Sequence, residues 1–239
     1  MMGGARHALA FLTRVPIDND NPRGMSSILA WFWLPGSVYG LIWMGARLAV
    51  PTIPANIGAL VAVAGEVLLS GGLHWDGWAD VFDAWGAPPD RRQAARQDAR
   101  LGAMGVLVLG LGLWAVLALW QDTVARGPVL WAVLPPLLAR SAMAVGLVVQ
   151  PVDPDSQLAN WLRSRVNPRG AWWSVAVSVA SAMALTGLSG VYLILVIAVV
   201  LILFWAATRR LFGGINGDVL GASAILTEIL WMAGQLGGW

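Results

Sequence analysis

The feature that most constrains the fold is a series of long apolar segments. Seven of them follow one another, each close to the ~20 residues that a helix needs to cross the apolar core of a bilayer. They cover residues 28–49, 53–73, 103–121, 128–149, 171–187, 190–208 and 219–237, and the fifth and sixth are separated by a tight glycine-containing turn. We therefore expect one all-α domain over residues 1–239, a polytopic integral membrane bundle with about seven transmembrane helices and short interfacial amphipathic helices.

The composition supports a membrane protein. Of the 239 residues, 58% are hydrophobic and 12% are charged, which is too apolar for a water-soluble core of this size. The absence of cysteine excludes disulfides and thiolate metal sites. All 15 cationic side chains are arginines, and most of them lie in the links between apolar segments. This distribution is typical of membrane proteins, so we expect the lipid bilayer as a partner and no nucleic acid.

The arginines also predict an orientation. With a cytoplasmic N-terminus, twelve arginines fall in inner links, against Arg47 and Arg126 outside and Arg140 within a span. The positive-inside rule therefore predicts a multi-pass protein whose N-terminus lies in the cytoplasm. In that orientation, segments 71–105, 151–170 and 213–218 face the cytoplasm.

Segment 71–105 concentrates the charge, with five of the 13 carboxylates and four of the 15 arginines. Read as a helix from about Asp76, it places Asp76, Asp80 and Asp83 at i, i+4 and i+7, on one face. Three like charges within two turns repel one another and gain proton affinity unless a cation lies among them. This spacing favours a divalent metal ion.

A second helix is predicted beyond Pro88 and Pro89. On it, Arg92, Arg96 and Arg100 follow one another at i, i+4 and i+8, whereas Asp98 points away from them towards the acidic face. Guanidinium groups fork onto phosphate oxygens, and hard divalent cations take oxygen ligands. The two helices together indicate a cytoplasmic site for a metal-bound phosphate ester.

Three motifs carry a resemblance to a known family. The run His74, Asp76-Gly77, Asp80, Asp83, Asp98, Arg100, Gly102, Gly105 resembles the signature of the cobalamin synthase family, also called adenosylcobinamide-GDP ribazoletransferase or cobalamin-5′-phosphate synthase. FLTRVPI at 11–17 and GGINGDVLGA at 213–222 agree with the same family in the same order, so the resemblance covers nearly the whole chain. The chain departs from the family at Ala84, Ala99, Ala103 and Asn216, and Ile225 replaces a glutamate, which leaves Glu228 of a usual acidic pair.

The resemblance implies a location in the bacterial cytoplasmic (inner) membrane with the active site facing the cytoplasm, a reaction, and roles for residues. Adenosylcobinamide-GDP would be joined to α-ribazole or its 5′-phosphate, with release of GMP, to give adenosylcobalamin or its 5′-phosphate. We interpret Asp76, Asp80 and Asp98 as ligands of one or two Mg²⁺ ions and Asp83 as the group that takes the proton of the attacking hydroxyl. His74 is placed in the catalytic set, as a phosphate contact, a proton carrier or a support for the metal ligands. Arg92, Arg96 and Arg100 would hold the departing GMP.

Further substrate-binding candidates come from the C-terminal half and from the apolar spans. Gly213, Gly214 and Gly217 would let backbone amides approach a phosphate, and Asp218 is either a helix cap or a substrate or metal contact. Ionisable groups within spans are costly unless partnered. Arg140 therefore either pairs with Glu66 or Glu228 to hold the bundle together or reaches the substrate; both Arg140 and Glu228 are included as substrate-binding candidates.

Other expectations concern loops and the N-terminal segment. Asp153 and the other loop aspartates are expected in solvated turns. Residues 8–15 predict a short interfacial helix that serves either as an anchor or in substrate binding. The sequence is also compatible with a homo-oligomer.

Two other functions, a CDP-alcohol phosphotransferase and a cation transporter, share some of these features. CDP-alcohol phosphotransferases also carry aspartates around an Asp-Gly pair, but they have an Ala-Arg pair soon after it, where this chain has Ala79-Asp80. A cation transporter would place carboxylates in facing helices at mid-membrane, whereas most of them here lie in one cytoplasmic segment.

Overall fold

The computed structural model describes residues 2–17, 22–88 and 100–237, and it is about 81% helical. Within these ranges there is no β-strand, and one isolated bridge joins Val152 to Ile215. The predicted all-α fold is confirmed.

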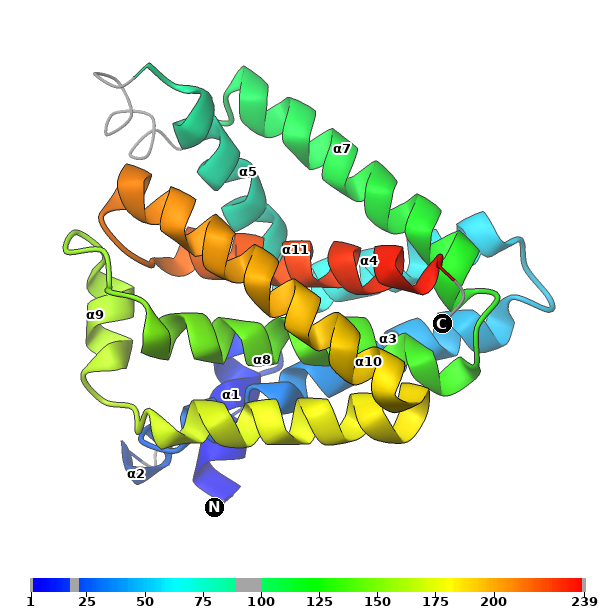
Figure 1. Ribbon diagram of the computed structural model, residues 1–239, viewed down its shortest axis with the longest axis horizontal. Coiled ribbons are helices and arrows are strands. Elements are labelled where there is room, and N and C mark those ends of the chain that lie inside the picture. The colour runs from blue at the N-terminus through cyan, green and yellow to red at the C-terminus, as the bar shows by residue number, and fades with distance from the viewer. Residues whose placement is uncertain (1, 18–21, 89–99, 238–239) are drawn as a thin grey trace.

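The helices form an elongated bundle (Figure 1). The long helices run along or obliquely to its long axis: α3 (Trp33–Ala49), α4 (Ala55–Ser70), α7 (Ala103–Leu119), α8 (Leu134–Val149), α10 (Arg169–Phe212) and α11 (Gly217–Gln235). Short elements complete the described chain: α1 (Met2–Leu12), α2 (Pro22–Met25), η1 (Ile28–Trp31), α5 (Leu73–Gly86), η2 (Trp120–Val124), η3 (Val129–Val133) and α9 (Gln157–Arg163).

Four described helical stretches are long and apolar enough to cross a membrane: Ile28–Ala49, Ala103–Val124, Val129–Val149 and Arg169–Phe212. The pair α4 and α5 adds a fifth if it is counted as one broken span. The prediction of about seven spans differs from this result for three reasons. The segment 53–73 becomes the shorter α4, and α11 carries two carboxylates and is less apolar. Helix α10 is counted once, although its two arms on either side of Gly187 correspond to the predicted fifth and sixth spans.

Helix α10 consists of two arms joined at Gly187. This residue has φ 68° and ψ −153°, a conformation that favours glycine, and the chain reverses its direction there (Figure 1). The tight turn predicted between the fifth and sixth segments is therefore present.

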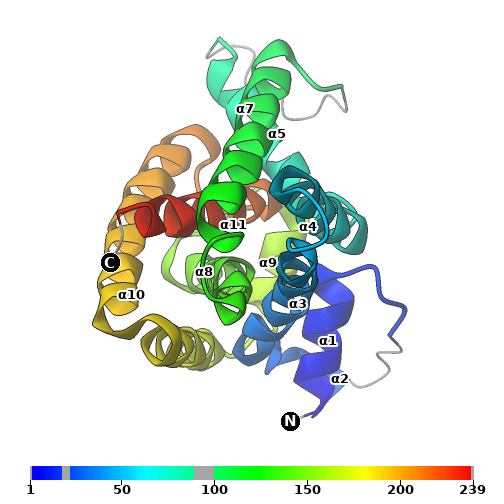
Figure 2. The same ribbon diagram turned by 90° about the vertical axis from the view of Figure 1, so that its right-hand side faces the viewer.

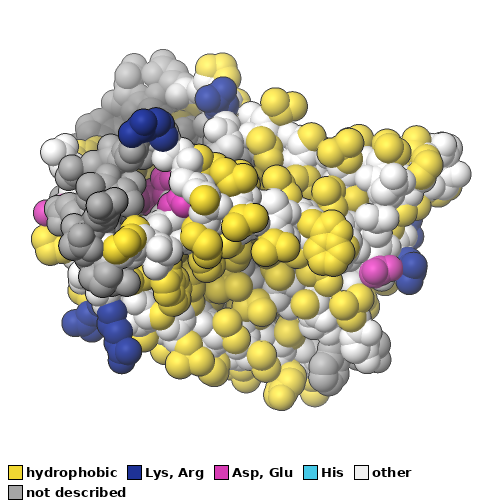
Figure 3. Space-filling view, turned by 90° about the horizontal axis from the view of Figure 1, so that it is seen from above, with side chains coloured by type: hydrophobic (Ala, Val, Ile, Leu, Met, Phe, Trp, Pro, Cys, Tyr) yellow, Lys and Arg dark blue, Asp and Glu magenta, His cyan; other side chains and the backbone are white. Residues whose placement is uncertain are grey.

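Helices α8 and α11 occupy the middle of the bundle when it is viewed along its long axis (Figure 2). Most residues of both helices are buried. The outer helices α7 and α10 instead expose large apolar side chains, such as Trp114 and Leu203. On the face shown in Figure 3, an apolar surface separates charged side chains at the two ends, the distribution that a bilayer requires.

One end of the bundle carries α5, α9 and the turn 213–217, and we call it the polar end (Figure 1). Gly71 and Gly72, with φ of 69° and 78°, end α4 and begin α5, which leaves at 89° to α4. Because α5 turns away at a right angle and carries three aspartates, we place it outside the apolar spans.

Helices α5 and α11 cross with their backbones in contact. A Cβ atom added to Gly77 would lie 2.7 Å from the carbonyl oxygen of Asp218, and one added to Gly221 would lie 3.2 Å from the Cα atom of His74. The glycine of the Asp-Gly pair is thus needed for packing: it lets the first turn of α11 approach the acidic face of α5.

We predict that Gly77→Ala lowers the stability of the protein. The added methyl group meets backbone atoms of α11, and overpacking of this kind costs about 1–3 kcal/mol. Thermal unfolding of the purified protein in detergent measures the effect. Gly110→Ala is the matched control, because Gly110 is also helical but has no atom within 4 Å of an added Cβ; it should unfold at or slightly above the wild-type temperature. Equal unfolding temperatures for the two variants would refute the crossing.

Candidate active site

The acidic face of α5 lies at the polar end. Asp76 and Asp80 are exposed one turn apart, and Asp83 follows, partly buried. The opposite side of the helix is buried, including Trp78 and Val81. The predicted acidic helix is therefore present, although it begins at Leu73 rather than at about Asp76.

Asp218, in the first turn of α11, joins this face through the close crossing at Gly77. Loss of hydration, followed by the negative charges of Asp76, Asp218 and Asp83, raises the pKa of Asp80 to about 6. The carboxylates are thus near enough to repel one another. A bound cation would relieve this repulsion.

Asp83 fastens α5 to the start of α7. Its two carboxylate oxygens accept hydrogen bonds from the backbone N–H groups of Gly102 and Gly105, both at 2.6 Å. Glycine is needed at these two positions because a Cβ atom would collide with the carboxylate. With both oxygens engaged, Asp83 caps α7, and its predicted role in taking a proton stays a prediction.

The turn before α11 is held by a buried aspartate. Asp153 is 1% exposed, accepts a hydrogen bond from the side chain of Asn216 at 3.3 Å, and donates its backbone N–H to Ile215. The expectation of a solvated turn at Asp153 was wrong, because this segment pairs with the turn preceding α11. That pairing had no local signal in the sequence.

The three glycines predicted to approach a phosphate have different surroundings. Gly214 is buried, and a Cβ atom there would lie 2.5 Å from the backbone nitrogen of Asp153. Gly213 ends α10 with φ 76°. Gly213 and Gly217 are exposed, and no atom lies within 4 Å of a Cβ added to Gly217.

Two cavities border the acidic segment. The larger, of about 510 Å³, is lined by Asp76, by the Gly71–Gly72 turn and by Arg14, which the sequence analysis did not include in the site. The smaller, of about 300 Å³, is lined by Asp83 and by the predicted substrate ligand Arg100. The predicted site residues Arg92, Arg96 and Asp98 lie outside the described residues.

Arg140 is the centre of a buried polar network. Its guanidinium group contacts Glu228 of α11, Glu66 of α4 at 2.5 Å, and Nδ1 of His74 at 3.2 Å. The ring of Tyr39 lies against it, 4.3 Å from Cζ. All five residues are at most 2% exposed.

Three of the residues predicted for the site belong to this buried network. His74, Arg140 and Glu228 are buried and contact one another through the Arg140 guanidinium group, whereas Asp76 and Asp80 are exposed. Since arginine can only donate, Nδ1 of His74 accepts and its Nε2 carries the hydrogen. The geometry favours the first alternative for Arg140, in which it pairs with glutamates to hold the bundle together.

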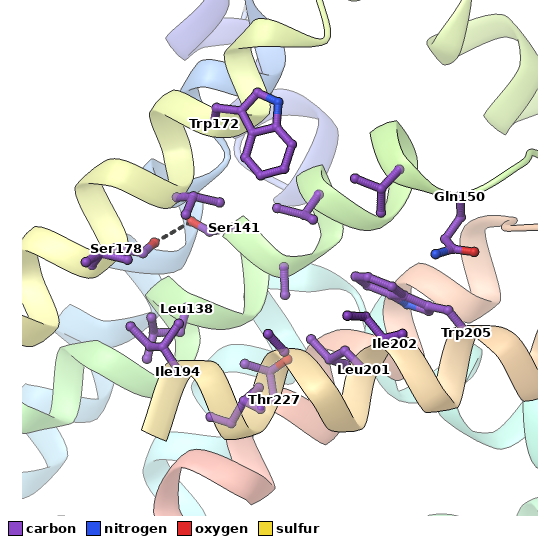
Figure 4. A pocket seen from close by; sticks show the side chains of 17 residues that line it. Leu138, Ser141, Gln150, Trp172, Ser178, Ile194, Leu201, Ile202, Trp205 and Thr227 are labelled. Carbon is purple, nitrogen blue, oxygen red and sulfur yellow. Dashed lines mark hydrogen bonds between the residues drawn. The ribbon is translucent and has the colours of Figure 1, made fainter. Parts of the chain in front are cut away.

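A separate apolar cavity of about 510 Å³ lies between α8, α11 and the two arms of α10 (Figure 4). Its polar groups are few, and among them Ser178 donates to Ser141 at 2.7 Å. No carboxylate or guanidinium group lines it. It therefore lacks the groups that phosphate chemistry needs and is not part of the candidate site.

The carboxylates of the acidic face are hard oxygen donors, the kind of ligand that Mg²⁺ takes. Within the described ranges, no group of three or more His, Asp or Glu side chains is close enough to hold a metal ion. The donor chemistry nevertheless fits Mg²⁺, because Asp76, Asp80 and Asp218 supply hard oxygen atoms whose charges repel one another. Asp98, the third predicted ligand, lies outside the described residues.

Comparisons with known proteins agree with the motifs. Residues 4–236 match the family described as cobalamin-5-phosphate synthase. Three similar proteins are each named adenosylcobinamide-GDP ribazoletransferase. The protein of Pseudomonas syringae pv. syringae is 34% identical (93% of this chain, 94% of that protein), that of Pseudomonas putida 35% (96% and 95%), and that of Nitratidesulfovibrio vulgaris 30% (95% and 92%). No solved structure matches.

We predict that Arg140→Met destabilises the protein by about 3–5 kcal/mol, because it leaves two buried carboxylates without their cation. Thermal unfolding in detergent measures the loss. Glu228→Gln should cost less, since glutamine still accepts from Arg140 and removes one negative charge. If Arg140→Met unfolds at the wild-type temperature but no longer binds substrate, the substrate-contact alternative is correct instead.

We predict that Asp80→Asn raises the unfolding temperature at pH 7.5 in the absence of divalent cations. A carboxyl group whose pKa is raised in the folded protein holds its proton more tightly there, so stability falls as pH rises from about 4 to about 6. The difference from wild type should disappear as the pH is lowered towards 4. Asp122→Asn, at the opposite end beside Arg126, should give no such gain; an equal gain would argue against repulsion at Asp80.

Proposed function

The chain belongs to the cobalamin-5-phosphate synthase family, and on this basis we propose that it joins adenosylcobinamide-GDP to α-ribazole, or to α-ribazole 5′-phosphate, with release of GMP. The protein is an enzyme of the ribazoletransferase type. The observation that carries the proposal is the gathering of Asp76, Asp80 and Asp218 at the polar end, beside a cavity that also holds Arg14.

The proposed reaction is a displacement at phosphorus. A ribose hydroxyl oxygen of α-ribazole bonds to the cobinamide-linked phosphorus, and the bond from that phosphorus to the bridging oxygen breaks. GMP departs with the bridging oxygen, and the hydroxyl proton passes to a carboxylate of the acidic face. Catalysis of such a step depends on positioning and on neutralising charge.

We propose that Asp76, Asp80 and Asp98 hold Mg²⁺, with Asp218 as an additional oxygen donor. The bound ion would neutralise negative charge on the pyrophosphate. The protein supplies the geometry for this arrangement. Asp83 keeps α5 against α7, and the Arg140 network keeps the start of α5 against α8 and α11. We therefore assign Asp83 a positioning role ahead of the predicted role in proton removal.

Arg100 lines the cavity next to Asp83, which supports its predicted contact with the departing GMP. Four exposed arginines lie at the polar end: Arg165 in the link after α9, Arg169 at the start of α10, and Arg209 and Arg210 in the last turn of α10. This supports a polar end that faces the cytoplasm, where nucleotide-activated substrates are found.

The rival functions find less support. The buried carboxylates Glu66 and Glu228 are engaged by Arg140, so they do not line a cation path as a transporter would require. Family membership favours a ribazoletransferase over a CDP-alcohol phosphotransferase.

We expect Asp76→Asn and Asp80→Asn to lower turnover by about 100-fold or more, as loss of a group that stabilises transition-state charge does. The assay incubates purified protein with adenosylcobinamide-GDP, α-ribazole and Mg²⁺ and measures GMP and cobalamin. Asp122→Asn is the matched control, because Asp122 is an exposed carboxylate away from the site. Near-full activity in either site variant would contradict the assignment. A folded wild-type protein that makes no corrinoid product would contradict the proposed reaction itself.

A further inference from the structure

The larger cavity is lined by a cationic side chain, Arg14, that has no role in the reaction as described so far. It belongs to the segment FLTRVPI, 57 residues before Gly71 in the chain, yet it lines the cavity together with Asp76 and the Gly71–Gly72 turn. Its side chain is exposed. Among the described residues, no hydrogen bond or ion pair engages its guanidinium group, so the charge of Asp76 is not neutralised by Arg14 directly.

The backbone around Arg14 is fixed on two sides. The backbone N–H of Arg14 donates to the carbonyl oxygen of Leu69 in α4 at 2.7 Å. Two residues earlier, the carbonyl oxygen of Leu12 accepts a hydrogen bond from the buried hydroxyl of Tyr39 in α3. The Thr13 hydroxyl between them donates to the carbonyl oxygen of Leu9 at 2.6 Å. The backbone that carries the Arg14 side chain is therefore held rigidly, which lowers the conformational entropy lost when Arg14 binds a ligand.

The side chain of Arg14 lies directly on the turn between α4 and α5. A Cβ atom on Gly71 would collide with Nε of Arg14 and lie 3.0 Å from its Cζ. The absence of a side chain at Gly71 thus leaves the space that the guanidinium group occupies. The same turn starts α5 and leads, four residues after Gly72, to Asp76.

We propose that Arg14 forms an anion subsite that binds a phosphate group of the nucleotide-activated substrate. A guanidinium group can donate two parallel hydrogen bonds to two oxygens of a phosphate group. Asp76, which lines the same cavity, belongs to the acidic face to which we assign the cation. Arg14 and Arg100 line different cavities, so two cations would contact the pyrophosphate and its leaving group from separate positions. This inference rests on the proposed function and names a substrate-binding residue for it.

The first test compares Arg14→Gln and Arg14→Lys with Arg6→Gln. Arg6 is exposed on α1, lies in the same N-terminal segment and lines neither cavity, so its loss removes the same charge elsewhere. We expect Arg14→Gln to raise the KM for adenosylcobinamide-GDP about tenfold or more, as loss of a charged hydrogen bond does. The KM for α-ribazole and the unfolding temperature should stay near wild type, and Arg14→Lys should be intermediate. An unchanged KM in Arg14→Gln would overturn the proposal.

The second test moves the guanidinium group without removing it. Gly71→Ala and Gly72→Ala introduce the same kind of backbone strain, because both glycines have positive φ, but only at Gly71 does the new methyl group meet Arg14. We expect a larger rise in the KM for adenosylcobinamide-GDP for Gly71→Ala than for Gly72→Ala. Equal kinetics in the two variants would show that the position of Arg14 over Gly71 is irrelevant to binding.

A binding measurement separates this proposal from the proposed reaction. Calorimetric titration of the purified protein with GDP and Mg²⁺ requires no turnover. Weaker GDP binding in Arg14→Gln, with wild-type binding in Arg6→Gln, would support the subsite even if no cobalamin is formed. Wild-type GDP affinity in Arg14→Gln would overturn the subsite even if the enzyme proves to be a ribazoletransferase.

Discussion

The buried ion pairs of Arg140 are the interaction on which the arrangement of the site depends. One guanidinium group contacts side chains from α4, α5 and α11 while its own helix, α8, runs through the middle of the bundle. Burying charges in an apolar bundle is costly, so a bundle that satisfies them has one favoured packing, and shifted packings would leave a charge unpaired. In this protein the favoured packing sets the start of α5.

From that fixed start, short-range contacts bring the functional groups together. The crossing at Gly77 and Gly221 places Asp218 beside Asp80, and Asp83 holds the far end of α5 to α7. The acidic face therefore stays in place although its charges repel one another. Among the described residues, the Arg140 network is buried, whereas Asp76, Asp80 and Arg14 are exposed at the polar end.

Patterns with a period of a few residues were predictable from the sequence. Helical spans followed from the apolar segments, the turn at Gly187 followed from its glycines, and the acidic face followed from the i, i+4, i+7 spacing of Asp76, Asp80 and Asp83. Contacts between distant segments were not predictable in this way. Asp153 looked like an ordinary turn residue because its partner lies 63 positions later. Arg14 belonged to the FLTRVPI motif and to the positive charges of an inner segment, but nothing local in the sequence placed it beside Asp76. The same reasoning could not decide between the two roles of Arg140, because the depth of a residue in a bundle is set by packing.

In the site that we propose, α5 and α11 contribute carboxylates to one bound cation. A double-mutant cycle of Asp80→Asn and Asp218→Asn, with Mn²⁺ binding followed by the electron paramagnetic resonance signal of the free ion, tests this most directly. If the two carboxylates share an ion, each single variant should weaken Mn²⁺ binding and the double variant should lose less than the sum of the two free-energy losses. Strictly additive losses, or an Asp218→Asn variant that binds Mn²⁺ as tightly as wild type, would contradict the account.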